Sequence, residues 1–179
     1  MKRLWIVCLW TVILLVCTPL YAQENKRPII VLDPGHGGVD SGAIGVNGVK
    51  EKDIVLEVAM EAIRLNRELF GNRLDIYLTR YRDTLISLSD RTRLVKVLKP
   101  DVFISIHCNQ AERKSAQGVE VYVQLPSSNT NSFLRSKSET LADAILFEFD
   151  QELGFKIRGM KYANFQVLRE TQNICPGVL

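Results

Sequence analysis

The chain contains only two histidines, and each lies just past the end of a short apolar segment. His36 ends the stretch 29–36 (IIVLDPGH), and His107 ends the stretch 101–107 (DVFISIH). If both segments are parallel strands, both imidazoles project from the same sheet edge, which is where open α/β sheets bind their ligands. Two neutral imidazoles with a nearby carboxylate make a catalytic zinc site with an open fourth position. The histidine pair therefore predicts a metal centre.

A zinc site of this kind needs a third ligand, and three carboxylates lie in or just after the glycine-rich segment 33–49. These are Asp40, Glu51 and Asp53. Asp53 is also placed to act as the N-cap of a following helix. Glu51 lies just before that helix, and its side chain is long enough to reach back over the strand ends. The spacing alone does not choose among the three.

Apolar periodicity predicts the elements that must position these residues. Strands are expected at 28–32, 73–79, 102–106, 118–124 and 165–168, with a further apolar run at 175–179. Helices are expected from the cap Asp53 to about residue 70, from the cap Ser89 to about 98, and over 136–153. This alternation favours a single α/β domain with a largely parallel, twisted sheet of about six strands and helices on both faces. Right-handed crossovers then bring His36 and His107 together.

The first 22 residues differ in character from the rest. Lys2 and Arg3 precede an apolar run over 4–16, and Ala22 offers a cleavage site, which is typical of a secretory signal peptide; an uncleaved anchor is the alternative. We expect a signal peptide at 1–22, a linker at 23–27 and one domain over 28–179. The protein is then periplasmic or extracellular, with no membrane contact after cleavage.

Charge and cysteine content fit an exported protein without a nucleic-acid partner. Cleavage removes two of the 23 basic residues and none of the 20 acidic ones, so the net charge falls from +3 to +1. No basic run is interleaved with aromatic residues. Two of the four cysteines remain, Cys108 and Cys175, and we expect two separate buried thiols rather than a disulfide.

Four ordered motifs carry a resemblance to a known family. They are the segments 33–38 (DPGHGG), 48–53 (GVKEKD), 78–80 (LTR) and 105–109 (SIHCN). Together they resemble the zinc-dependent N-acetylmuramoyl-L-alanine amidases of bacterial cell walls, the amidase-3 type. The resemblance implies that His36, Glu51 and His107 bind one Zn²⁺. It also implies cleavage of the amide between N-acetylmuramic acid and the L-alanine of peptidoglycan stem peptides.

Further residues are candidates for supporting this centre or for touching the substrate. Asp33 and backbone carbonyls are expected to orient the imidazoles through their second nitrogens. Arg80 and Asp83 match a Thr-Arg-x-x-Asp feature of the family, either as an ion pair that braces the loop or as substrate contacts. Asn109 either steadies its loop or contacts the stem peptide.

The end of the sequence departs from the family pattern. Members carry a glutamate in a late strand resembling Pro-x-Val-Leu-Val-Glu, and this general base would fall two residues beyond Leu179. We therefore expect a domain incomplete at its C-terminus that binds zinc but hydrolyses poorly. Glu120 and Glu170 are interpreted as surface or sheet-edge residues and not as substitutes. The alternatives are a non-catalytic zinc-containing peptidoglycan-binding protein or remnant, and a zinc enzyme acting on another amide.

Overall fold

The computed structural model describes residues 26–109 and 116–179, so the predicted signal peptide and most of the predicted linker lie outside the described residues. Among the described residues, no helix combines the length and the apolar character needed to span a bilayer. The elements follow the order β1 (Ile29–Pro34), α2 (Glu51–Glu68), β2 (Asp75–Leu78), α3 (Leu88–Leu98), β3 (Val102–Ile106), β4 (Val119–Gln124), α4 (Ser132–Gln151), β5 (Ile157–Ala163), α5 (Gln166–Thr171) and β6 (Gly177–Val178).

The strands form two parallel groups, of order β2-β1-β3-β6 and β4-β5. Tyr122 of β4 and Leu179, just after β6, join the groups because they exchange both backbone hydrogen bonds, at 2.7 and 3.0 Å. This reciprocal exchange is the pattern of antiparallel neighbours. The largely parallel six-stranded architecture predicted from the sequence is confirmed.

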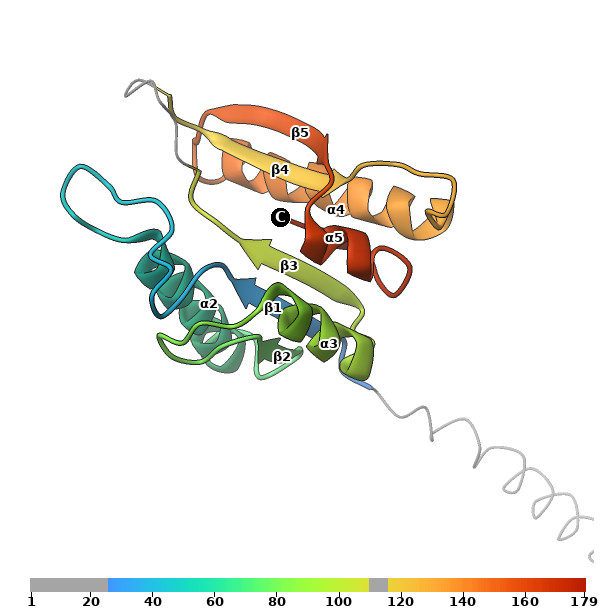
Figure 1. Ribbon diagram of the computed structural model, residues 1–179, viewed down its shortest axis with the longest axis horizontal. Helices are drawn as coiled ribbons and strands as arrows, with labels where there is room; N and C mark the ends of the chain where they lie inside the picture. Colours follow the sequence, from blue (N-terminus) through green and yellow to red (C-terminus); the bar gives the residue numbers. More distant parts are fainter. Residues whose placement is uncertain (1–25, 110–115) are drawn as a thin grey trace, which may run out of the picture.

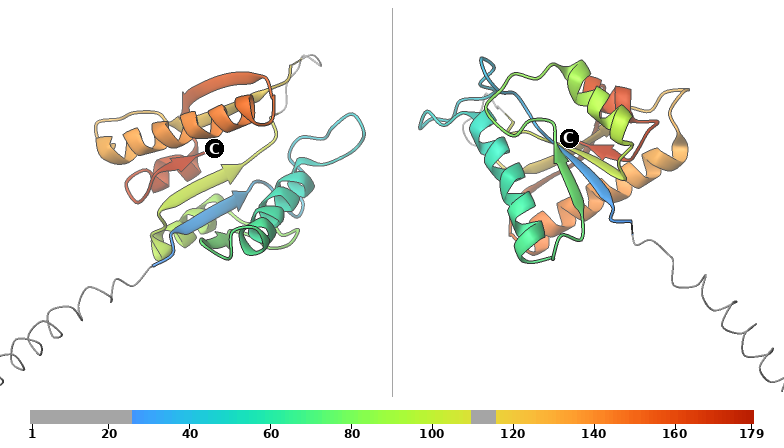
Figure 2. Two further views of the ribbon diagram at one scale, coloured as in Figure 1. Left: turned by 180° about the vertical axis from the view of Figure 1, so that it is seen from behind. Right: turned by 90° about the horizontal axis from the view of Figure 1, so that it is seen from below.

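Helices cover both faces of the strands (Figure 1). α2 and α4 lie on one face, and α3 and α5 lie on the other, as the view from behind in Figure 2 also shows. The face under α3 and α5 buries Val31, Val95 and Phe103. On the opposite face, Leu32 packs with residues of α2 and β2, and a further cluster joins α4 to β4 and β6. Strands buried on both faces explain the continuous apolar runs of β1 and β3.

The paired register of β1 and β3 creates the edge that carries the histidines. Pro34 lies opposite Ile106, and the N–H of Gly35 donates to the carbonyl of Ile106 at 3.0 Å. His36 and His107 therefore leave neighbouring strands at the same end.

Near the C-terminus one predicted strand is wrong and one observed strand was not predicted. The segment 165–168, predicted as a strand, begins helix α5, because Val167, Leu168 and Thr171 share one buried helical face. A short apolar run cannot distinguish these two structures. Strand β5 escaped prediction because its charged residues and Gly159, with φ of +90°, interrupt the apolar pattern.

Three predicted helix starts also differ from the structure. α2 begins at Glu51 after Lys50, so Asp53 lies within its first turn and is not the N-cap. Ser87, rather than Ser89, caps α3 by accepting a hydrogen bond from the N–H of Asp90. α4 begins at Ser132, four residues earlier than expected, and Asn131 caps it by accepting hydrogen bonds from two backbone N–H groups. α2 has no side-chain cap, because the residue before it is Lys50. The caps of α3 and α4 are each one of several Ser, Asp or Asn residues in a polar stretch, and local sequence does not decide which residue closes the first turn.

Candidate metal centre

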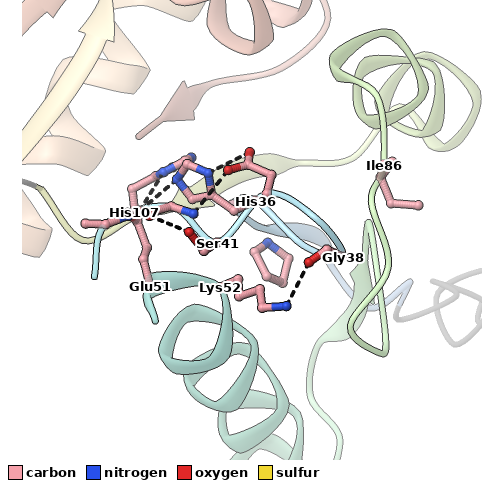
Figure 3. A network of polar contacts seen from close by, with 12 residues as sticks. His36, Gly38, Ser41, Glu51, Lys52, Ile86 and His107 are labelled. Atoms are coloured by element: carbon pink, nitrogen blue, oxygen red, sulfur yellow. Dashed lines mark hydrogen bonds and ion pairs between the residues drawn. The ribbon is translucent and has the colours of Figure 1, made fainter. Parts of the chain in front are cut away.

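Three side chains converge beyond the carboxyl ends of β1 and β3. One ligand atom from each of His36, Glu51 and His107 can be chosen so that all lie within 4.8 Å of one another. Glu51 Oε1 lies 3.2 Å from His36 Nε2 and 2.9 Å from His107 Nδ1. The two rings meet edge to face, with centroids 4.8 Å apart. Figure 3 shows the three side chains gathered above the start of α2.

Glu51 is the first residue of α2, and backbone amides from two loops fix its side chain. Its Oε2 accepts from the N–H of Ala43 at 2.9 Å, and its Oε1 accepts from the N–H of Cys108 at 2.7 Å. Burial raises the pKa of Glu51, but the bonds from His107 and from these two amides outweigh it and lower the pKa to about 2. The buried carboxylate is therefore charged at neutral pH.

This arrangement fits a zinc ion. Ligand distances of about 2.0–2.1 Å in a tetrahedral site place neighbouring ligand atoms ~3.3 Å apart. The separations at Glu51 Oε1 are close to that value. Two imidazole nitrogens and one carboxylate oxygen are also the donor set of known catalytic zinc sites that keep a fourth position for water. His36, Glu51 and His107 would hold the ion.

The backbone conformation of Gly35 and His36 places the His36 ring at the centre. His36 has φ of +58°, a left-handed conformation that non-glycine residues adopt at a cost. Gly35 is needed because the ring of His107 lies against it. A Cβ at that position would stand 2.3 Å from His107 Cε1 and 2.5 Å from His107 Nε2.

Two buried arginines hold this turn by its carbonyl oxygens. Arg80 donates to the carbonyls of Pro34 at 3.0 Å and Gly35 at 2.8 Å. Arg91 donates to the carbonyls of Pro34 and His36, both at 2.7 Å. Three consecutive carbonyls are thus fixed from below, which stabilises the left-handed backbone of His36.

Arg80 and Arg91 form a layer of buried guanidinium groups beneath the turn, which we call the arginine layer. The prediction that Asp33 orients an imidazole is wrong, because Asp33 bonds to this layer. Its Oδ1 lies 2.5 Å from Arg91 and accepts from Thr79 Oγ1 at 2.6 Å, while its Oδ2 accepts from Ser105 Oγ at 2.8 Å. The carboxylate that does bond to a ring is Asp40, whose Oδ2 lies 2.9 Å from His36 Nδ1. That bond, followed by the bond from the N–H of Gly42, lowers the pKa of Asp40. Asp40 thus lies behind a ligand candidate, and Asp53 is exposed on α2, outside the cluster of potential ligand atoms.

The predicted ion pair between Arg80 and Asp83 is replaced by another. Asp83 pairs with Lys52 Nζ at 2.6 Å and accepts from the N–H of Gly38, and Lys52 also donates to the carbonyl of Gly38 (Figure 3). Arg80 is 3% exposed and bonds to backbone carbonyls. Arg80 thus braces the backbone through carbonyls instead of through an ion pair with Asp83.

Asn109, one residue past Cys108, lies between the centre and an ionic cluster. Its side-chain amide donates to Glu120. The side chain of Glu120 is 3% exposed, lies 3.1 Å from Arg158 and accepts from Lys161. Of the expected surface or sheet-edge position, the structure excludes the surface and places Glu120 near the start of β4. Burial raises the pKa of Glu120, but its hydrogen bonds and the two cations lower the pKa by more, so the net shift is downward. Glu120 is therefore an ionised carboxylate held by its partners.

A groove of about 460 Å³ opens beside the two histidines, within the size range of small-ligand sites. Asp40 and Asn109 lie at its metal end. Its walls come from the segment before α3 and from the start of α5, and they are mainly apolar: Leu85, Ile86, Leu88, Phe165 and Val167.

The two described cysteines are separate thiols, as predicted. Cys175 is buried, and burial raises the pKa of its thiol to about 12. Cys108 is only half-buried, and burial followed by the charge of Glu51 raises the pKa of its thiol.

Arg91 is the supporting residue that the sequence reading missed. A signal for it exists, because Arg91, Val95 and Leu98 are spaced as one helical face. A charged residue on the same helical face as buried apolar residues indicates a buried ion pair. Its partner Asp33 lies 58 positions away, however, and no local pattern connects the two.

The fold and the site together define a class of protein: α/β domains with two histidines and one glutamate arranged as a candidate metal centre at the carboxyl edge of a parallel sheet. Residues 30–179 match the family model described as N-acetylmuramoyl-L-alanine amidase. The chain belongs to this family.

Relatives and solved structures agree with that assignment. The chain is 35% identical over 162 residues to the N-acetylmuramoyl-L-alanine amidase LytC of Bacillus subtilis, covering 88% of this chain and 30% of LytC. It is 36% identical to the probable cell wall amidase LytH of Staphylococcus epidermidis, covering 89% of this chain and 49% of LytH.

Among solved structures, the catalytic domain of the amidase CwlV of Bacillus (Paenibacillus) polymyxa matches with a TM-score of 0.72 and 34% identity, over 86% of this chain and 78% of that one. An N-acetylmuramoyl-L-alanine amidase of Clostridium difficile 630 matches with a TM-score of 0.73 and 29% identity, over the same shares. The chain covers 30% of the length of two of the curated relatives that it matches and 52% of a third.

Proposed function

We propose that this chain is a zinc-dependent hydrolase domain that cleaves the amide between N-acetylmuramic acid and L-alanine in peptidoglycan. The observation that carries the proposal is the convergence of His36 Nε2, Glu51 Oε1 and His107 Nδ1 at the sheet edge. Membership of the amidase family supports the choice of bond.

The bound zinc would supply a Lewis acid and a water whose pKa falls to about 7. The chain's own residues prepare the site for it. Glu51 keeps a negative charge in a buried position, and the amides of Ala43 and Cys108 fix its orientation. The arginine layer holds the backbone of His36, so the ligand atoms are set before the substrate arrives.

The groove beside the histidines is our proposed substrate site. Its mainly apolar walls suit the methyl groups of the lactyl unit and of L-alanine. Asn109 also lines the groove and donates to Glu120, which supports a role for its side chain in contacting a peptide amide of the substrate.

The register of β6 indicates where a general base would stand. Gly177 lies opposite Phe103 and Val178 opposite Ile104. Continued at the same register, the second residue after Leu179 would lie opposite His107. We propose that the family glutamate, where a strand carries it, acts from that point by taking a proton from the attacking water and passing it to the leaving nitrogen.

We also propose that the protein acts outside the cytoplasm. A basic start followed by an apolar run and Ala22 supports export, and peptidoglycan, the proposed substrate, lies there. In this view residues 1–22 are a cleaved signal peptide and residues 28–179 are the amidase domain.

The test incubates the zinc-loaded protein with purified muropeptides and measures release of stem peptides bearing a free L-alanine amine. His36→Ala, Glu51→Gln and His107→Ala should each lose most of the bound zinc and any hydrolysis. Metal content is measured separately by atomic absorption.

Three outcomes separate the alternatives. Release of free stem peptide supports the amidase. Zinc-dependent binding of muropeptides without release in any form of the protein supports the peptidoglycan-binding alternative. Release of a different product would identify a zinc enzyme for another amide, and full zinc retention in all three variants would refute the metal centre.

A further inference from the structure

The two histidines present different ring nitrogens to the centre. His36 turns Nε2 toward Glu51 Oε1, at 3.2 Å, whereas His107 turns Nδ1 toward the same oxygen, at 2.9 Å. A ligating nitrogen must be unprotonated, so the proton of each neutral ring belongs on the opposite nitrogen. With zinc bound, His36 must therefore carry its proton on Nδ1, and His107 must carry its proton on Nε2. Without the metal, His107 Nδ1 faces the ionised Glu51 as a hydrogen-bond donor.

A carboxylate faces the second nitrogen of His36. Asp40 Oδ2 lies 2.9 Å from His36 Nδ1. An ionised carboxylate can only accept hydrogen bonds, so this contact requires the proton on Nδ1. Among the described residues, His107 Nε2 has no such partner.

Asp40 is itself held on both sides. Its Oδ1 accepts from the N–H of Gly42 at 3.1 Å, and its backbone exchanges two hydrogen bonds with Gly37. Gly42 in turn lies against the centre, because a Cβ there would stand 2.6 Å from His36 Cδ2 and 2.7 Å from Glu51 Oε2. The segment 37–42 therefore wraps the His36 ring and fixes the carboxylate behind it.

We propose that Asp40 is a positioning residue that keeps the proton of His36 on Nδ1 and so directs the Nε2 lone pair to the metal. Its carboxylate lies on the far side of the ring from Glu51, so it does not act as the general base. The inference takes from the proposed function only that the centre binds zinc, and it requires no peptidoglycan cleavage.

Asparagine at this position distinguishes proton control from simple loop support. Both oxygens of Asp40 accept, from Gly42 N–H and from the ring. An asparagine has one oxygen, and turning its NH₂ toward Gly42 N–H would oppose two donors. The oxygen therefore keeps Gly42, and the NH₂ faces His36 Nδ1, which favours the tautomer with its proton on Nε2. In this tautomer the Nε2 of His36 carries the proton and has no lone pair to bind the metal.

The experiment measures zinc affinity by chelator competition for the wild type, Asp40→Asn, Asp40→Ala and the control Asp150→Asn. Asp150 is exposed near the end of α4 and bonds to Gln151. We expect a 10–100-fold loss of zinc affinity in Asp40→Asn, at least as large as the loss in Asp40→Ala. The control should match the wild type. A role confined to loop support predicts the reverse order, because asparagine retains the bond to Gly42.

Nitrogen-15 spectra of the zinc-loaded protein give a second readout, and only two histidines contribute to them. We expect the wild type to show His36 protonated on Nδ1 and His107 protonated on Nε2, and the His36 signals alone to change in the Asp40 variants. Two rings with the same protonated nitrogen, or zinc affinity in Asp40→Asn within threefold of wild type, would overturn the proposal. Zinc binding without muropeptide cleavage in any form of the protein, including one extended to carry the glutamate, would leave it intact and would count against the proposed function.

Discussion

The guanidinium of Arg91 lies 2.5 Å from the carboxylate of Asp33, and both side chains are almost completely buried beneath the turn that carries His36. Arg91 uses its remaining donors on the carbonyls of Pro34 and His36. A helix on one face of the sheet is thereby connected to the backbone of a metal-ligand candidate at the sheet edge.

Removing the charge of Arg91 should therefore destabilise the protein strongly. In Arg91→Met the carboxylate of Asp33 stays buried without its cation, and the loss is expected to be about 3–5 kcal/mol in the free energy of unfolding. Urea denaturation measures it. The matched control is Arg93→Met, whose side chain is 75% exposed, and this change should cost less than about 0.5 kcal/mol. Equal stabilities for the two variants would contradict the inferred role of Arg91.

A methyl group on Gly35 should disturb the centre from the other side. The ring of His107 occupies the space that a Cβ would need, so Gly35→Ala must push the ring away from Glu51. Overpacking of this kind costs about 1–3 kcal/mol, and zinc affinity should fall at least about tenfold. Chelator competition checks the affinity. Gly45→Ala is the comparison, since its Cβ would meet mainly the Asn47 side chain; an unchanged affinity in Gly35→Ala would show that the ring can relax.

Glu120 should make stability depend on acid pH. Its folded pKa is lowered, so its contribution is present above its ordinary pKa of 4.5 and is lost as the pH falls through the lower folded value. We expect the wild type to lose stability more steeply than Glu120→Gln below pH 4.5. Urea denaturation of both proteins at several pH values measures the difference. Parallel curves would show that the contacts with Arg158 and Lys161 contribute little.

Extension of β6 offers a test of the proposed general base. The register predicts that a glutamate two positions after Leu179 would lie opposite His107. A form of the protein extended by valine and glutamate should hydrolyse muropeptides at least about a hundredfold faster than one extended by valine and glutamine, in line with general acid–base catalysis. Both forms should bind zinc equally. Equal hydrolysis rates would place the base elsewhere.

Much of the fold was predictable because it is encoded in local patterns. Strand β3 was predicted with its observed bounds, since a buried parallel strand reads as a continuous apolar run. The helical segment 166–171 and strand β5 were not predicted, because a short apolar run and a strand interrupted by two charged residues and a glycine have no distinctive period.

The sequence by itself indicated the chemistry of the candidate centre: two histidines just past strand ends and three nearby carboxylates, Asp40, Glu51 and Asp53, from which only the family resemblance selected Glu51. Only the tertiary structure decided which nitrogen of each ring faces inward, that Asp40 rather than Asp33 lies behind His36, and that Arg91 supports the turn. The physical reason is distance along the chain. Residue type and local period are written in neighbouring positions, whereas hydrogen bonds between segments depend on how strands, loops and helices pack in space.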